Sequence, residues 1–247
     1  IAGGEPLVRA DDLFALAEDN PSVIFPVFTN GILIDDKIVS LFKKHRNVIP
    51  VLSIEGGDIL TDQRRGKGVY ERAHQKMKSL KKNSIFFGVS FTVMKQNLSE
   101  VISNEIVKVL CGEGVGLFFY NEYTLVEDGT TEYCISAQQR SAMLSTIEQR
   151  RKEHKRLFIA FPGEEDLFGG CLSAGRGFVH VAPDGRLEAC PFAPFGDTSS
   201  ATQSLSEALK SPTLSVIRKH HDQLHETAGG CALWDKREWV EGLLNNR

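Results

Sequence analysis

Short apolar runs alternate with longer amphipathic segments over residues 11–154, and this alternation constrains the fold more than any other feature of the sequence. The apolar runs are nearly continuous, as in parallel strands that are buried on both faces. We expect strands at Val23–Thr29, Val48–Ile54, Ile85–Thr92 and Val115–Tyr120. Because strands that alternate with helices form right-handed βαβ units, the pattern predicts an open parallel sheet or a β/α barrel.

The amphipathic segments between these strands predict helices. We expect helices at Asp11–Glu18, Asp35–Lys44, Gly68–Lys82, Leu98–Cys111 and Ala137–His154. Short polar or acidic residues, which helix starts favour, stand at Asp35-Asp36 and Ser99-Glu100.

The glycine-rich segment Gly112–Gly116 has the glycine spacing of a dinucleotide-binding loop. A phosphate-binding loop follows a strand and opens a helix, whereas this segment follows an expected helix and opens an expected strand. The segment therefore predicts a helix C-cap and a loop.

The pattern changes in the last part of the chain, where glycine and proline become frequent from Leu157 onward. Phe178–Leu187 predicts a β-hairpin, because apolar residues flank a Pro183-Asp184-Gly185 turn. Further helices are expected at Ser204–Lys210, Leu214–His225 and Lys236–Leu244. We place a domain boundary near residue 155, which gives a larger domain of residues 1–155 and a smaller one of residues 156–247.

The composition is that of an ordinary globular protein, and it argues against several classes of partner. The net charge of −3 provides no global field that would attract nucleic acid or an anionic membrane. No apolar run approaches the roughly 18 residues that a membrane span needs. Five cysteines are an odd number in a chain with no sign of secretion. We expect a reduced, cytoplasmic protein that binds neither nucleic acid nor membrane.

Three cysteines stand out in the C-terminal part. Cys171 and Cys190 flank the expected hairpin, and Cys231 follows further along the chain. Cys190-Pro191 matches the Cys-Pro that ends one type of ferredoxin cluster run. Structural zinc sites use closely spaced cysteine pairs, and none exists here. The residues alone leave iron–sulfur ligation and burial as small apolar side chains both open, with zinc as a third alternative. Cys111 and Cys134 are interpreted as structural.

Several short motifs occur in an ordered series: Gly3-Gly4-Glu5-Pro6, Thr29-Asn30-Gly31, Ser53-Ile54-Glu55-Gly56 and Arg64-Arg65-Gly66-Lys67-Gly68. In order and spacing this series resembles that of radical S-adenosylmethionine (SAM) enzymes. The C-terminal part resembles the SPASM/twitch type of auxiliary-cluster module. Its Gly-x₄-Cys pattern is matched by Gly185–Cys190, with Cys171 upstream and Cys231 downstream.

The resemblance implies an α/β fold with two parts. Residues 1–155 would form a partial (β/α)₆ TIM-like barrel that lacks its first strand. Residues 156–247 would form a small α+β twitch-like module with a β-hairpin. The family's Cys-x₃-Cys-x₂-Cys segment, which holds the catalytic [4Fe–4S] cluster, would precede Gly3 and is not among these 247 residues. We expect it upstream in the full-length protein.

The resemblance also implies which residues contact SAM. The set comprises Gly3, Gly4, Glu5, Pro6, Asn30, Ser53, Glu55, Arg65 and Ser90. The backbone of the Gly-Gly-Glu-Pro segment would meet the SAM amino group. Ser53 and Glu55 would contact the ribose or the amino group, and Arg65 would neutralise the methionine carboxylate. Thr92 is a further candidate on the same strand as Ser90.

The function implied is reductive cleavage of SAM to a 5′-deoxyadenosyl radical, which abstracts hydrogen from a peptide or small-molecule substrate. Cys171, Cys190 and Cys231 would hold an auxiliary [4Fe–4S] cluster. A flavodoxin or ferredoxin would supply electrons. The alternative is a non-catalytic, barrel-derived protein that uses the same three cysteines for a structural zinc or an iron–sulfur electron-transfer centre.

Overall fold

The computed structural model describes residues 1–125, 129–162, 165–225 and 231–245. The chain divides into two compact units. The first unit comprises Ile1–Glu122 and Gln138–Phe161, and the second comprises Tyr123–Ala137 and Pro162–Arg247. This division differs from the expected single boundary near residue 155, because residues 123–137, which precede the helix expected at Ala137–His154, belong to the second unit.

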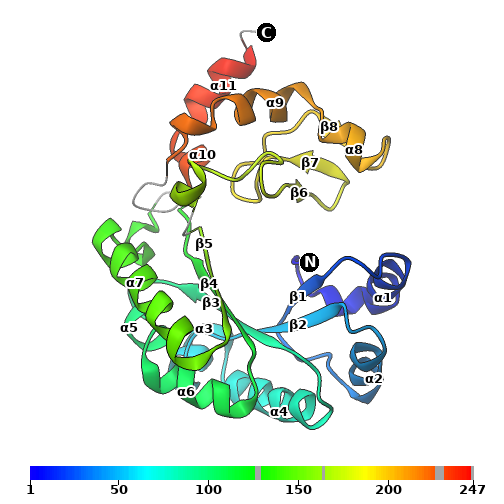
Figure 1. Cartoon of the computed structure of the whole chain (residues 1–247), viewed down its shortest axis with the longest axis vertical. Coiled ribbons are helices and arrows are strands. Elements are labelled where there is room, and N and C mark those ends of the chain that lie inside the picture. The colour runs from blue at the N-terminus through cyan, green and yellow to red at the C-terminus, as the bar shows by residue number, and fades with distance from the viewer. Residues whose placement is uncertain (126–128, 163–164, 226–230, 246–247) are drawn as a thin grey trace. The chain divides into compact units, whose positions relative to one another are not determined.

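A five-stranded parallel sheet forms the centre of the first unit (Figure 1). The sheet has the order β1-β2-β3-β4-β5, and every neighbouring pair is parallel. The strands are β1 Phe25–Thr29, β2 Val48–Ser53, β3 Gly88–Val93, β4 Leu117–Glu122 and β5 Leu157–Phe161. The expected parallel α/β arrangement is confirmed, with strand ends shifted by a few residues.

Helices connect the strands, and in Figure 1 α2, α4 and α6 lie along the outer side of the sheet. The helical segments are η1 Pro6–Arg9, α1 Ala10–Asp19, α2 Asp36–Lys44, α3 Asp58–Arg65, α4 Val69–Lys82, α5 Leu98–Val101, α6 Asn104–Glu113 and α7 Ala137–His154. Helix α4 shows why they pack there: Val69, Ala73, Met77 and Leu80 are buried and recur at three- and four-residue intervals.

The core of the first unit lies along the middle strands. Val51, Val89 and Phe91 are fully buried, as expected for a parallel sheet covered on both faces. Phe118 stacks on Phe158 of the neighbouring strand with ring centroids 4.7 Å apart. Each such buried side chain contributes about 1.5–3 kcal/mol to folding.

Strand β5 is not among the strands that we expected. It is the edge strand of the sheet, and Leu157 and Ile159 are exposed while Phe158 between them is buried. The strand follows α7 almost directly, through Lys155 in a left-handed conformation with φ 50°. The strand is a continuous apolar run, Leu-Phe-Ile-Ala-Phe, but it stands at the point where glycine and proline become frequent, and the sequence analysis assigned it to the C-terminal part.

Two helix predictions need correction. The single helix expected at Leu98–Cys111 is two helices, because the Ser103 side chain accepts a hydrogen bond from Ile106 N at 3.3 Å and begins α6. Helix α3 was not expected at all, and Thr61 is its one buried residue among those described. The C-cap prediction is confirmed: Gly114 ends α6 with φ 100°.

The second unit contains a small antiparallel sheet and short helices. Its elements are η2 Thr131–Tyr133, η3 Glu165–Phe168, β6 His180–Val181, β7 Arg186–Glu188, β8 Thr198–Ser199, α8 Leu205–Ala208, α9 Pro212–Lys219, η4 His221–Gln223, α10 Ala232–Asp235 and α11 Arg237–Asn245. Strands β6 and β7 form the expected hairpin, and Gly185 takes φ 85° in its turn. The helix expected to reach His225 ends at Lys219.

The second unit has its own apolar core. Leu187, Leu214, Ile217 and Leu233 are buried in one cluster, which also includes buried cysteines. No helix within the described ranges is both long enough and apolar enough to cross a membrane.

Candidate functional site

Polar residues gather where the carboxyl ends of β1 to β4 meet at one edge of the parallel sheet. Strand register brings Ser53 beside Ser90 and Thr92 beside Asn121. In open α/β sheets and barrels, ligands bind at this edge, because loops from neighbouring strands converge there. The candidate site is therefore built at the ends of these strands.

Glu5 fixes the Gly3-Gly4-Glu5-Pro6 segment to the end of β1. Its carboxylate accepts hydrogen bonds from Thr29 Oγ1 at 2.8 Å, from Asn30 N at 2.9 Å and from Leu7 N at 3.2 Å. Gly3 and Gly4 are exposed, and no atom lies within 4 Å of where a Cβ would stand on either. The glycine backbone is thus held at the sheet edge by the following glutamate and stays open, beside a hollow of about 350 Å³.

Glu55 is the most buried charged group at this edge, with 1% of its surface exposed. Its Oε1 accepts hydrogen bonds from Arg65 Nε at 2.7 Å and Nη2 at 2.6 Å, and pairs with Arg64 Nη1 at 2.8 Å. Its Oε2 accepts from Thr92 N at 3.3 Å. Two guanidinium groups against one carboxylate leave a surplus positive charge, which suits an anionic ligand.

The turn after β2 holds Glu55 in place through its own backbone. Glu55 N donates to Thr61 Oγ1 at 3.0 Å, and Asn97 Nδ2 donates to Glu55 O at 3.1 Å. Gly56 has φ 138°, and a Cβ there would lie 2.5 Å from Glu100 Oε1. The turn therefore favours glycine at position 56 because of its backbone conformation, and any other residue would also have to displace the Glu100 carboxylate.

Ser53 and Ser90 differ in exposure. Ser53 is half-buried at the end of β2, whereas Ser90 is buried and its Oγ accepts a hydrogen bond from Asn121 Nδ2 at 2.8 Å. Asn30 is half-buried and its side chain accepts from Ile32 N at 2.9 Å. Asn30 follows β1 and Ser53 ends β2, whereas Ser90 is the third residue of β3 and lies beside Ser53. Sequence reasoning did not single out Asn121.

Asp62 ties α3, which carries both arginines, to the start of α4. Its carboxylate accepts from Gly68 N at 2.6 Å and from Tyr70 N at 2.9 Å. These backbone hydrogen bonds, that from Tyr70 first, lower the pKa of the Asp62 carboxyl below its ordinary value.

We expect Asp62→Asn to destabilise the chain in a pH-dependent way. When the pKa of a carboxyl is lower in the folded than in the unfolded chain, the carboxyl stabilises the fold above the unfolded pKa of about 3.8. This stabilisation is lost as the pH falls through the folded pKa. Urea unfolding at pH 7 should therefore show a lower midpoint for the variant, with the difference shrinking toward pH 3. Asp19→Asn, at an exposed helix end, serves as control. An equal loss at both pH values would contradict this role.

A second buried ion pair, which sequence reasoning missed, lies in the same unit. Arg140 of α7 donates to both carboxylate oxygens of Glu122, from Nε at 2.6 Å and from Nη2 at 2.5 Å. Burial raises the pKa of Glu122 above its ordinary value, and the guanidinium opposes that shift. The one feature of the sequence that points to this ion pair is Glu122 itself, an acidic residue at the end of a buried strand. Tyr120, also on β4, is fully buried and its hydroxyl donates to Val101 O.

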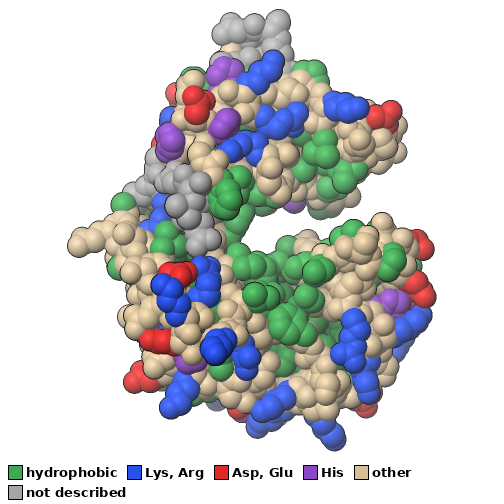
Figure 2. Space-filling view, in the orientation of Figure 1, with side chains coloured by type: hydrophobic (Ala, Val, Ile, Leu, Met, Phe, Trp, Pro, Cys, Tyr) green, Lys and Arg blue, Asp and Glu red, His purple; other side chains and the backbone are tan. Residues whose placement is uncertain are grey.

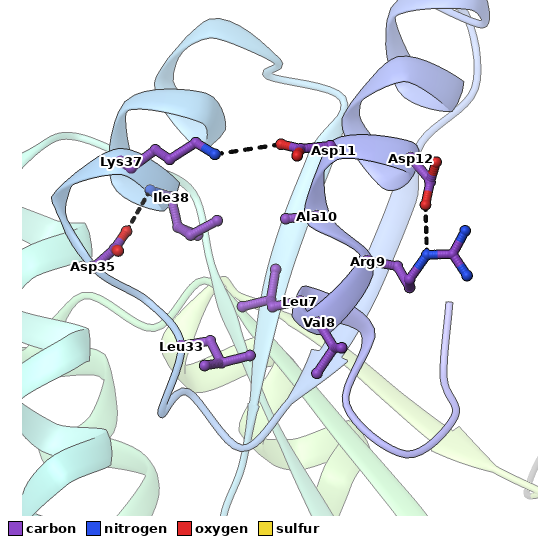
Figure 3. A pocket seen from close by; sticks show the side chains of 10 residues that line it. All are labelled: Leu7, Val8, Arg9, Ala10, Asp11, Asp12, Leu33, Asp35, Lys37 and Ile38. Atoms are coloured by element: carbon purple, nitrogen blue, oxygen red, sulfur yellow. Dashed lines mark hydrogen bonds and ion pairs between the residues drawn. The ribbon is translucent and has the colours of Figure 1, made fainter.

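A larger hollow of about 480 Å³ lies between η1, α1 and α2 (Figure 3). Its charged groups already have partners: Arg9 pairs with Asp12 at 2.6 Å, Lys37 with Asp11 at 3.4 Å, and Asp35 caps α2 by accepting from Ile38 N. Figure 2 shows lysine and arginine side chains spread over the outer helices on the face drawn, rather than in one patch. Neither feature forms a candidate site.

The three cysteines singled out by the sequence lie together in the second unit. Cys190 donates a thiol hydrogen bond to Cys231, and both interact electrostatically with Cys171. This bond and burial raise the pKa of Cys190, whereas the same bond and the backbone N–H groups of Trp234 and Leu233 lower that of Cys231. Burial, with the negative charge of Glu165, raises the pKa of Cys171 to about 12.

The chemistry of this set of donors fits an iron–sulfur cluster, since thiolate sulfur is the usual protein ligand of such clusters. Among the residues that the structure describes, no group of three or more His, Cys, Asp or Glu side chains is arranged to hold a metal ion. Cluster binding would break the hydrogen bond between Cys190 and Cys231, because each thiolate binds a different iron and the proton must leave.

Comparison with curated proteins gives two relatives. Pre-heme d1 synthase of Dinoroseobacter shibae is 35% identical over 123 residues, which are 48% of this chain and 30% of that protein. Fe-coproporphyrin III synthase of Methanosarcina barkeri is 28% identical over 167 residues, which are 64% of this chain and 41% of that protein. The chain therefore spans less than half the length of these relatives. No protein-family model matches it.

A solved structure shares the fold. The structure of anSMEcpe with bound AdoMet (SAM) and the Cp18Cys peptide matches with a TM-score of 0.68 and 16% identity, covering 99% of this chain and 84% of that one. At this identity the likeness shows the fold alone. Taken together, the comparisons point to a radical SAM enzyme and confirm that part of the resemblance seen in the sequence, whereas the SPASM/twitch-like module stays a prediction. The parallel sheet matches the partial TIM barrel of these neighbours.

Proposed function

We propose that the full-length protein containing this chain is a radical SAM enzyme, with SAM bound at the carboxyl ends of β1 to β3. The observation that carries this proposal is that the buried Glu55 orients Arg65 at the carboxyl edge of the sheet, where the Gly3-Gly4 backbone is also exposed. When bound, the reduced catalytic cluster and SAM together supply a 5′-deoxyadenosyl radical that abstracts hydrogen from the substrate. The chain's own residues bind and orient SAM.

Each residue at the sheet edge has a distinct part in this proposal. Arg65 binds the methionine carboxylate, because a guanidinium presents two parallel N–H groups to a carboxylate. The backbone of Gly3 and Gly4 meets the amino group. Ser53 supplies a hydroxyl for the ribose. Glu55, whose oxygens are already taken by arginines and Thr92 N, positions Arg65 rather than contacting SAM.

Other residues of the site support this arrangement. Glu5 and Pro6 set the position of the glycine pair through the anchor on Thr29 and Asn30. Ser90, bonded to Asn121, forms the floor of the site beside Ser53. These are positioning roles, so we expect them to affect SAM affinity less than Arg65 does.

Cys171, Cys190 and Cys231 hold an auxiliary [4Fe–4S] cluster in this proposal, with residues 156–247 as the SPASM/twitch-like module. The support is that three thiols from separate segments gather in the core of the second unit. The substrate is a peptide or a small molecule. The two curated relatives are named for tetrapyrrole products, and their identity to this chain is about twice that of the peptide-bound neighbour, so we favour a tetrapyrrole.

The proposed function predicts a product that can be measured directly. Full-length, anaerobically reconstituted protein incubated with SAM and dithionite should release 5′-deoxyadenosine, detected by liquid chromatography. A mixture of biosynthetic tetrapyrrole precursors should stimulate the release more than a cysteine-containing peptide does. The full-length Cys171→Ala/Cys190→Ala/Cys231→Ala variant should bind about four fewer irons and sulfides per chain, as one cubane cluster is lost.

Two results would contradict the proposal separately. Cluster-loaded protein that releases no 5′-deoxyadenosine above a control without reductant would overturn the radical SAM assignment. A triple variant with unchanged iron and sulfide would overturn the auxiliary-cluster assignment alone. Bound zinc without sulfide would support the structural alternative.

A further inference from the structure

Arg64 and Arg65 contact the same oxygen of Glu55, but they do so differently. Arg65 meets Oε1 through Nε at 2.7 Å and through Nη2 at 2.6 Å, whereas Arg64 meets it through Nη1 alone at 2.8 Å. Within the part of the chain that the structure describes, the Arg64 guanidinium forms no other ion pair and donates to no further acceptor. The parallel N–H groups on its Nε and Nη2 are therefore open to a ligand.

This openness sets Arg64 apart from arginines that serve the fold. Arg140 donates to both carboxylate oxygens of Glu122, and Arg176 donates to three backbone carbonyls. A buried carboxylate such as Glu55 needs a cation beside it, and Arg65 already supplies one through two contacts. The side chain of Arg64 is 40% exposed, and its charge is additional to what Glu55 requires.

The fold places this open guanidinium at the carboxyl edge of the parallel sheet. Glu55 follows β2 closely, and its second oxygen, Oε2, accepts a hydrogen bond from Thr92 N of β3 at 3.3 Å. The two arginines on Oε1 therefore lie at the ends of β2 and β3. Because parallel α/β sheets bind their ligands at this edge, Arg64 stands where a substrate is expected.

The sheet face that carries Ser53 and Ser90 is concave and largely apolar. Strand register places Phe119 and Ile159 on this face as well. Phe28 of β1 packs edge-to-face on Phe119 of β4, with ring centroids 5.1 Å apart, although two strands separate them. In a flat sheet the backbones of these strands would lie about 14 Å apart, so the sheet curves around this face. The five strands contribute no charged side chain to it.

We propose that Arg64 binds a carboxylate of the substrate while Arg65 binds that of SAM, so that the substrate is an organic acid with an apolar body. This inference rests on the proposed function and names the kind of substrate. Parallel N–H groups match the two oxygens of a carboxylate, and the concave face suits an uncharged, apolar body. Because both guanidinium groups contact one Glu55 oxygen, the substrate acid is held next to SAM.

The test compares the binding of two probes to full-length, cluster-loaded protein with SAM and without reductant. One probe is coproporphyrin, which carries carboxylates on an apolar macrocycle, and the other is its amide, in which those groups are neutral. Equilibrium dialysis should show that wild-type protein binds the carboxylate form about tenfold more tightly. Arg64→Gln should remove this preference and leave the affinities for the amide and for SAM unchanged. Arg64→Lys keeps the charge and should retain part of the preference.

Two controls separate the charge of Arg64 from general effects. Arg46→Gln should keep the wild-type preference, because Arg46 is an exposed arginine that precedes β2 at the opposite edge and donates to Ser84 O. Tricarballylate, a short polycarboxylate without an apolar body, should displace coproporphyrin only weakly. Displacement as strong as that by coproporphyrin itself would contradict the role of the concave face.

Other results would overturn the assignment of Arg64. Wild-type protein that binds both probes equally, or neither, would do so, and so would Arg64→Gln with the wild-type preference. A loss of SAM affinity in Arg64→Gln as large as that in Arg65→Ala would assign Arg64 to the SAM site instead. Wild-type protein that fails to bind SAM or to release 5′-deoxyadenosine would overturn the proposed function, which keeps the two failures distinct.

Discussion

In the full-length, cluster-loaded protein, Arg65→Ala is expected to weaken SAM binding about tenfold to a hundredfold. Hydrogen bonds to a charged group are worth about 1.5–3 kcal/mol, and each 1.4 kcal/mol corresponds to a factor of ten in affinity. Arg65 carries this expectation because Glu55 orients its guanidinium with two N–H groups on one oxygen. Equilibrium dialysis with labelled SAM measures the dissociation constant.

Arg64→Ala is the matched comparison. Arg64 is more exposed than its neighbour and meets Glu55 through a single contact at 2.8 Å. Its loss is expected to change SAM affinity by less than about threefold, since partly exposed ion pairs are worth about 0–1 kcal/mol. Equal losses in the two variants, or none in Arg65→Ala, would mean that the arginine pair attracts anions without binding the SAM carboxylate.

The largest loss of stability is expected from Arg140→Ala. Removing one partner from a buried ion pair costs about 3–5 kcal/mol, because the other charge is left uncompensated. Glu122, with 2% of its surface exposed, would be that charge. Since a typical domain is stable by about 5–15 kcal/mol, this change removes a large part of the total. Far-UV circular dichroism during urea unfolding measures this loss of stability. Tryptophan fluorescence is less suitable, because both tryptophans lie in the second unit.

The double variant Glu122→Leu/Arg140→Met provides the control. Apolar residues of similar volume in place of a buried ion pair are often neutral or stabilising, so most of the lost stability should return. If the double variant were as unstable as Arg140→Ala alone, the unpaired Glu122 charge would not be the cause of the loss.

The sequence was a good guide to the central sheet and a poor one to its edges. The strands at the centre are buried on both faces, so their continuous apolar runs gave a strong signal. Strand β5 is also a continuous apolar run, but it lies at the expected domain boundary, and only the folded structure shows that it pairs with β4. Helix α3 is held by tertiary contacts of Thr61, Asp62 and Arg65 rather than by an apolar face. Local patterns do not reveal such contacts.

For the candidate site, the motifs predicted which residues gather at the strand ends but not which ones position the others. Glu5 and Glu55 look alike in the sequence as acidic residues near strand ends. Glu5 anchors a backbone segment, whereas Glu55 holds two guanidinium groups. The partner of Glu122 comes from α7, after a polar connection that belongs to the other unit. These pairings depend on the folded arrangement of distant segments.

Cys171, Cys190 and Cys231 come from three separate stretches of a unit with little regular structure. A group that binds all three would join those stretches like a covalent crosslink and would reduce the conformational freedom of the unfolded chain. Delivery of iron and sulfide would then complete the folding of this unit. Before delivery, this unit would be more accessible to proteases than the sheet unit, and cellular iron supply would set how long the protein survives.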